Sequence, residues 1–133
     1  MMKMYLNGVF IGKNNSYTLK ANGDMPFRIG AGRNNNNCAY FFNGKIDEVG
    51  IWSSELSSDE IVQLYNSGET LYAGDNYGDY TSSVSLTEYW TMDDNAEADN
   101  GSGTTLYGEE NNNDGTLNGG PTWSTDFPGT VPT

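Results

Sequence analysis

Short apolar runs separated by Asn, Gly and Asp recur along this chain. Two Asn-Gly dipeptides, Asn7-Gly8 and Asn43-Gly44, each lie between such runs. Asn-Gly favours a two-residue hairpin loop, because a type I′ turn needs a positive φ at both positions. The pattern therefore predicts one β-hairpin over residues 3–12 and a second that joins 38–42 to a returning strand at 45–52.

The returning strand is apolar on both of its faces. Val49 and Ile51 alternate with neighbours that put Ile46 and Trp52 on the opposite side. A strand of this kind is normally covered on both faces. We therefore expect residues 45–52 to lie inside the domain.

A single short helix is predicted directly after this strand. Ser57 and Glu60 have the spacing of a capping box, in which each side chain satisfies a free backbone N–H of the first turn. Ile61 and Leu64 follow at helical spacing, and Gly68 is a typical C-terminal stop. The helix is expected near residues 57–67.

The remainder of the chain indicates further short strands joined by polar loops. Residues 69–85 are rich in Gly, Asp, Tyr and Ser without a clear period, which favours a connecting loop of unusual length. Further strands are expected at 17–19, 26–30, 86–92, 104–107 and 116–117. The pattern as a whole predicts an all-β domain with one helix.

Composition supports this class and excludes several functions. The chain has 133 residues, of which 35% are hydrophobic and 13% aromatic, so it suits an all-β domain with a small core. Its net charge of −12 opposes binding to nucleic acid and to acidic membrane surfaces. No apolar stretch is long enough to insert into a membrane, and the N-terminus does not resemble a signal peptide.

Three runs and the helix resemble the end of a known type of domain. Residues 4–9, 27–30 and 42–52 look like the last three strands of the laminin-G-like (LamG) branch of the concanavalin A-like lectin/glucanase superfamily. The helix that begins near Leu56 belongs to the same signature. Residues 86–92, 101–105 and 113–123 resemble the beginning of such a domain.

The resemblance implies that the parts of the domain are in permuted order. Residues 1–68 would supply closing strands and the helix, 69–85 a connecting loop, and 86–124 opening strands that fold back on the first part, while 125–133 form an extended tail. The middle strands are missing, so the expected fold is a reduced antiparallel sandwich of jelly-roll type. The strand at 86–92 would lie beside 45–52. In the alternative, another chain supplies or covers the missing strands, which favours an oligomer.

The residues disfavour catalysis. The chain has no histidine, which excludes a Ser–His or Cys–His dyad. Asp47 and Glu48 are adjacent, so on a strand they would point to opposite faces and could not act on one glycosidic bond. Cys38 is interpreted as a small buried residue at a strand start. We expect no enzymatic activity.

Two kinds of binding site remain open. Members of the laminin-G-like branch often bind Ca²⁺, and the resemblance places Asp47 with Asp94 or Asp114 as candidate ligands; the alternative is that these are solvated loop carboxylates. Tyr72, Tyr77 and Tyr80 lie in the polar connection and could stack on sugars or instead cover the sandwich. The three tryptophans, Trp52, Trp90 and Trp123, are expected in the core.

The function expected from these features is a non-catalytic structural or decorating module on a larger assembly. A phage-type virion is the favoured setting, as capsid decoration or fibre, with glycan contact and with a second copy or neighbouring capsid or surface subunits as partners. The alternative is a free, secreted carbohydrate-binding or adhesion module, and a glycan-cleaving enzyme is the least favoured. The expected location is a virion or extracellular surface.

Overall fold

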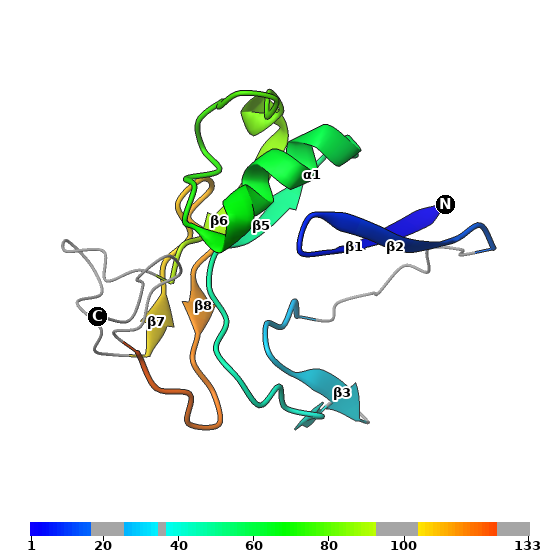
Figure 1. Ribbon diagram of the computed structural model, residues 1–133. Helices are drawn as coiled ribbons and strands as arrows, with labels where there is room; N and C mark the ends of the chain where they lie inside the picture. Colours follow the sequence, from blue (N-terminus) through cyan, green and yellow to red (C-terminus); the bar gives the residue numbers. More distant parts are fainter. Residues whose placement is uncertain (17–25, 35–36, 93–103, 125–133) are drawn as a thin grey trace, which may run out of the picture.

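The computed structural model describes residues 1–16, 26–34, 37–92 and 104–124. Within these residues the chain forms small antiparallel sheets and one short α-helix, which confirms the predicted all-β class (Figure 1). Four sheets are described, pairing β1 with β2, β3 with β4, β5 with β6, and β7 with β8. The elements are β1 (Met2–Leu6), β2 (Val9–Asn14), β3 (Gly32–Asn34), β4 (Asn37–Ala39), β5 (Val49–Trp52), α1 (Ser58–Tyr65), η1 (Asn66–Gly68), η2 (Ser83–Ser85), β6 (Leu86–Trp90), β7 (Thr105–Leu106) and β8 (Gly115–Thr116).

The first predicted hairpin is confirmed. Asn7 and Gly8 have φ values of 50° and 73°, as a type I′ turn requires, and they join β1 to β2. The Lys3 ammonium lies 2.5 Å from a carboxylate oxygen of Glu55, just before the helix. The hairpin also reaches α1, because a Cβ added to Gly8 would stand 3.0 Å from the ring of Tyr65. The hairpin is thus anchored at its turn and at one strand.

The second predicted hairpin, at Asn43-Gly44, is wrong. β4 ends at Ala39 and pairs backward with β3, while β5 begins only at Val49. Residues 40–48 between them form no strand, and Tyr40 and Glu48 both have a φ of 53°, in the left-handed region. The hairpin is not formed because β4 takes β3 as its partner and the left-handed residues Tyr40 and Glu48 interrupt the extended backbone on both sides of Asn43-Gly44. The strand expected at 26–30 is also absent.

The pairing of β5 with β6 brings the two parts of the chain together, as predicted for strands 45–52 and 86–92. The register contains a bulge: Ile51 lies opposite Glu88, but Trp52 lies opposite Leu86. The extra residue, Thr87, changes which face its neighbours occupy. Leu86 therefore shares a face with Tyr89, whereas regular alternation without a bulge would put Leu86 on the face of Glu88.

The main core lies on the Tyr89 face of this two-stranded sheet. Its buried residues are Ala73, Leu86 and Tyr89, and the partly buried Trp52 and Leu64 pack against them. Ala73 comes from the 69–85 connection and Leu64 from α1, so both segments cover this face (Figure 1). The 69–85 segment forms no named strand, and part of it belongs to the core.

The capping box at the start of α1 is confirmed in full. Glu60 N–H donates to Ser57 Oγ at 3.2 Å, and Ser57 N–H donates to Glu60 Oε2 at 2.8 Å. At the other end the helix stops at Tyr65, and Asn66, with a φ of 42°, takes the left-handed cap position. The predicted stop at Gly68 therefore lies two residues too late, at the end of the 3₁₀ turn η1.

Glu60 also fastens the connecting segment to the helix. Only 7% of the residue is exposed, and Thr81 N–H donates to its second oxygen at 3.3 Å. The hydrogen bond from the Ser82 side chain, followed by that from the Ser57 N–H, lowers the pKa of Glu60 from 4.5 to about 2 in spite of its burial. The ionised carboxylate is therefore part of the folded structure.

This lowered pKa predicts a specific acid sensitivity. A carboxyl whose pKa is lower in the folded than in the unfolded chain stabilises the fold above pH 4.5, and this contribution is lost as the pH falls toward about 2. Glu60→Gln should thus destabilise the protein most at neutral pH, with the difference from wild type shrinking over that window. Urea unfolding at a series of pH values measures the difference. Asp59→Asn, which removes an exposed charge from the same helical turn, is the control, and an equal effect of both substitutions would contradict the assignment.

Candidate carbohydrate-binding site

Two of the three tyrosines predicted to contact sugars lie at the surface on fixed supports. The exposed fractions of Tyr72 and Tyr77 are 41% and 39%. The ring of Tyr72 leans against the buried ring of Tyr89, with centroids 5.6 Å apart. The backbone of Tyr77 exchanges two hydrogen bonds with Tyr80, at 2.7 and 3.0 Å. Each ring thus presents part of its surface to solvent from a well-anchored position.

The third tyrosine, Tyr80, has a packing role instead. It is fully buried, so its ring has no face for a sugar. Its hydroxyl accepts a hydrogen bond from Trp52 Nε1 at 2.9 Å and donates one to the Ala73 carbonyl at 2.8 Å. The alternative interpretation, that these tyrosines cover the reduced sandwich, therefore holds for Tyr80, whereas Tyr72 and Tyr77 remain candidate sugar contacts.

Acidic residues lie near the exposed rings of Tyr72 and Tyr77. Tyr77 Oη donates to Asp75 Oδ2 at 3.5 Å. Glu109 N–H donates to the Tyr89 carbonyl at 2.9 Å, which brings the loop after β7 alongside the residue that supports Tyr72. Burial is the largest effect that raises the pKa of Tyr72, and negative charges add to it, those of Glu110, Glu109 and Asp75. We call Tyr72, Tyr77, Asp75 and Glu110 the tyrosine site.

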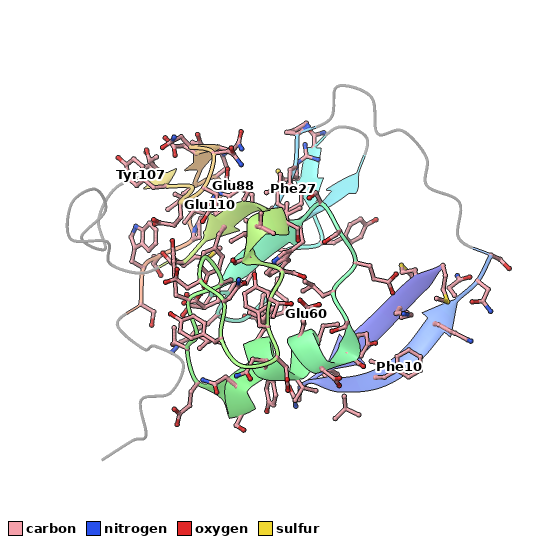
Figure 2. The ribbon with its side chains drawn as sticks, turned by 90° about the horizontal axis from the view of Figure 1, so that it is seen from above. Phe10, Phe27, Glu60, Glu88, Tyr107 and Glu110 are labelled. Atoms are coloured by element: carbon pink, nitrogen blue, oxygen red, sulfur yellow. The ribbon has the colours of Figure 1, made fainter. Side chains whose placement is uncertain are left out.

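The loop that carries Glu110 is held in place by a buried carboxylate. Glu88, on the second face of β6, is 2% exposed, and its Oε1 accepts from the N–H groups of Glu110 at 3.1 Å and Asn111 at 3.4 Å. Its Oε2 accepts from Asn113, from the backbone at 3.1 Å and from the side chain at 2.6 Å. Figure 2 shows Glu88 and Glu110 next to each other, far from the hairpin residue Phe10.

These hydrogen bonds decide the chemistry of Glu88. Burial alone would raise the pKa of Glu88, but the bonds from Asn113, Glu110 and Asn111 outweigh it and keep the pKa below its ordinary value. Both oxygens face N–H donors, so this carboxylate organises a loop and is not arranged as a cation ligand or general acid. This role of Glu88 was not predicted, although a Glu between the apolar Leu86 and Trp90 of an expected strand is a sequence signal for it.

Two contacts of Trp90 cover the Glu88 face of the β5–β6 sheet further. Trp90 Nε1 donates to the Asn113 carbonyl at 3.1 Å, and the ring of Phe27 stacks on Trp90 with centroids 5.7 Å apart. Trp90 is buried, and Trp52 and Trp123 are partly buried. Cys38, expected to be buried, is exposed on β4.

The predicted calcium ligands are not brought into a complete site by the residues that the structure describes. Asp114 Oδ1 accepts from Gly108 N–H at 3.2 Å, and Asp47 Oδ1 accepts from Glu48 N–H at 3.1 Å. Asp94 lies outside the described residues. Within the described part of the chain, no three His, Cys, Asp or Glu side chains are grouped as metal ligands would be. The calcium site stays a prediction.

Asp47 and Glu48 do not lie in a strand as expected. β5 begins after them, at Val49, and Glu48 has a φ of 53°. The prediction that Asp47 and Glu48 point to opposite faces of a strand is therefore wrong, because β5 is shorter than the apolar pattern suggested. The expectation that the chain is not an enzyme is not tested by this change.

A close approach at Gly108 gives a test of the Glu88 arrangement. A Cβ at this position would lie 2.8 Å from Glu88 Oε1 and 3.0 Å from Asn113 N, so Gly108→Ala must displace one of them. We expect a loss of about 1–3 kcal/mol in the free energy of unfolding. Gly12→Ala, with nothing within 4 Å of the added carbon, is the control and should change it by less than about 0.5 kcal/mol. Equal unfolding midpoints for both variants in urea would show that Glu88 is not tightly enclosed.

No helix among the described residues has the length and apolarity needed to span a bilayer.

Comparison with known proteins supports the resemblance seen in the sequence. A laminin-G-type family model, described as the concanavalin A-like lectin/glucanases superfamily, matches residues 1–62. No curated protein and no solved structure matches the chain. A concanavalin A-like domain indicates a carbohydrate-binding or adhesion-type module. The match over residues 1–62 therefore supports the laminin-G-like resemblance to the concanavalin A-like lectin/glucanases superfamily that the sequence predicted.

Proposed function

We propose that the protein is a non-catalytic carbohydrate-binding module that contacts glycans through the tyrosine site. The observation that carries this proposal is the pair of part-exposed rings, Tyr72 and Tyr77, anchored to buried tyrosines and flanked by carboxylates. Aromatic rings cover the apolar faces of sugars, and carboxylates accept hydrogen bonds from sugar hydroxyls. Because the rings are held before binding, little conformational entropy is lost when a sugar stacks on them.

The affinity of a single such site is expected to be modest, because two half-exposed rings bury little surface. Repeated presentation on a larger particle would raise it through avidity. A weak glycan site is therefore compatible with a module that acts in many copies at a surface.

Glycan-array screening with the purified protein tests the proposal. We expect binding to a defined set of oligosaccharides, and about a tenfold or greater loss of affinity in Tyr72→Ala and in Tyr77→Ala. Tyr40→Ala, which removes a ring that is 75% exposed elsewhere, should leave binding unchanged. Bound glycans should be recovered uncut. Binding that survives both site substitutions would remove the tyrosine site from consideration, and cleaved products would favour the glycan-cleaving alternative.

We also propose that the protein decorates a larger assembly, with a phage-type virion or another extracellular surface as the setting. The β1–β2 hairpin supports this second candidate. Its large apolar side chains are 46–64% exposed, namely Met2, Met4, Leu6, Val9, Phe10 and Ile11. An isolated two-stranded sheet is marginally stable in water, and its edges offer unpaired N–H and C=O groups to another chain. Neighbouring subunits or a second copy are the partners that this surface would take.

Native mass in solution tests the decoration proposal. We expect species larger than the 14.5 kDa monomer, held together through the hairpin. The double variant Val9→Thr and Ile11→Thr keeps β-branched side chains while reducing apolar surface, and should shift the mass toward the monomer. Val84→Thr, at a position 92% exposed outside the hairpin, is the control. A wild-type protein that is monomeric at all concentrations in light scattering would contradict self-assembly.

A further inference from the structure

We propose that the tyrosine site prefers glycans that carry free amino groups, of the glucosamine type. This inference rests on the proposed carbohydrate-binding function and names the class of ligand. The sugar ring would lie against Tyr72 or Tyr77, and its ammonium group would be held by Asp75 and Glu110.

Positively charged side chains are confined to residues 1–45 of the chain. All six basic residues lie at or before Lys45, and no Lys, Arg or His occurs from residue 46 to the end. The tyrosine site is built entirely from residues 72–110, so its segments carry carboxylates and no cation. Of the basic residues, Lys3 is bound to Glu55 at 2.5 Å, on the β1–β2 hairpin. The residues that form the site therefore bring negative charge and no positive charge of their own.

Carboxylate-bearing residues lie close to both rings. The Tyr77 hydroxyl donates to Asp75 Oδ2 at 3.5 Å. Glu110 follows Glu109, whose N–H donates to the carbonyl of Tyr89, the residue whose ring contacts Tyr72. A cation within about 6 Å of an aromatic ring is attracted by the negative face of the ring. Ring and carboxylate thus favour the same positively charged group, while a sulfated or carboxylated glycan would be repelled by both.

The carboxylate-bearing loop is fixed before a ligand arrives. The backbone N–H of Glu110 is bonded to the buried carboxylate of Glu88 at 3.1 Å (Figure 2). Asp75 lies in a turn whose N–H bonds back to the Tyr72 carbonyl at 3.5 Å. Two acidic side chains on fixed backbone can select between an ammonium and an uncharged acetamido group at a defined place on the sugar.

A matched pair of ligands tests the preference directly. Titration calorimetry would compare a glucosamine oligosaccharide with its fully N-acetylated counterpart of the same length, at a pH where the amines are protonated. We expect the amine form to bind at least about tenfold more tightly. The double variant Asp75→Asn and Glu110→Gln should reduce that ratio to near one, and Tyr72→Ala should weaken both ligands.

A charge-matched control separates a site from general attraction between a polycation and a protein of net charge −12. The double variant Asp59→Asn and Glu69→Gln removes the same two charges from α1 and the residue after η1. It should keep the amine preference, which should also persist, at reduced strength, near physiological salt. Equal loss of preference in both double variants would overturn the proposal.

The remaining outcomes distinguish this inference from the function on which it rests. If both ligands bind equally and Tyr72→Ala weakens both, the carbohydrate site stands and the amine preference is wrong. If neither ligand binds but a neutral glycan on the array binds through Tyr72, the amine preference is again wrong. If no glycan binds at all, the proposed function itself fails.

Discussion

The antiparallel pairing of β5 with β6 is the interaction on which the rest of this structure depends. It joins Val49–Trp52 to Leu86–Trp90 across more than thirty residues of chain, and the bulge opposite Trp52 places Leu86 on the same face as Tyr89. The Tyr89 face receives α1 and the connecting segment, and the Glu88 face receives the loop after β7. Without this pairing, neither the core nor the tyrosine site would have a support.

Two buried carboxylates, those of Glu60 and Glu88, hold segments together that apolar packing would hold in a larger core. Glu60 joins the helix start to residues 81–82, and Glu88 gathers the N–H groups of residues 110–113. A buried charge is tolerated only when it is well hydrogen-bonded, and backbone N–H groups meet that demand without a basic residue. This solution suits a chain that has only 35% hydrophobic residues and no cation after Lys45.

The small number of apolar residues also affects the two surfaces through which the protein would act, the tyrosine site and the β1–β2 hairpin. The core takes up Tyr80 and Tyr89, and these in turn hold Tyr77 and Tyr72 at the surface. Among the described residues, the apolar side chains of the β1–β2 hairpin stay exposed, although a contact with Tyr65 and an ion pair with Glu55 attach the hairpin to the helix region. Glycan recognition and assembly would therefore use separate parts of the molecule, as the distance between Glu110 and Phe10 in Figure 2 shows.

The sequence by itself determined the features that depend on neighbouring residues. The hairpin at Asn7-Gly8, the capping box of Ser57 and Glu60, the all-β class and the laminin-G-like pattern of residues 1–62 were all predictable, because turn and cap geometry is set within a few positions. The sequence also suggested that residues 86–92 lie beside 45–52, through the resemblance.

Only the tertiary structure decided what the distant segments bury. It paired β4 with β3 in place of the expected Asn43-Gly44 hairpin, buried Tyr80 while leaving Tyr72 and Tyr77 exposed, and enclosed Glu88 in a loop more than twenty residues away. These outcomes depend on competition among long-range partners for the same backbone groups and the same space, and that competition leaves no local signal in the chain.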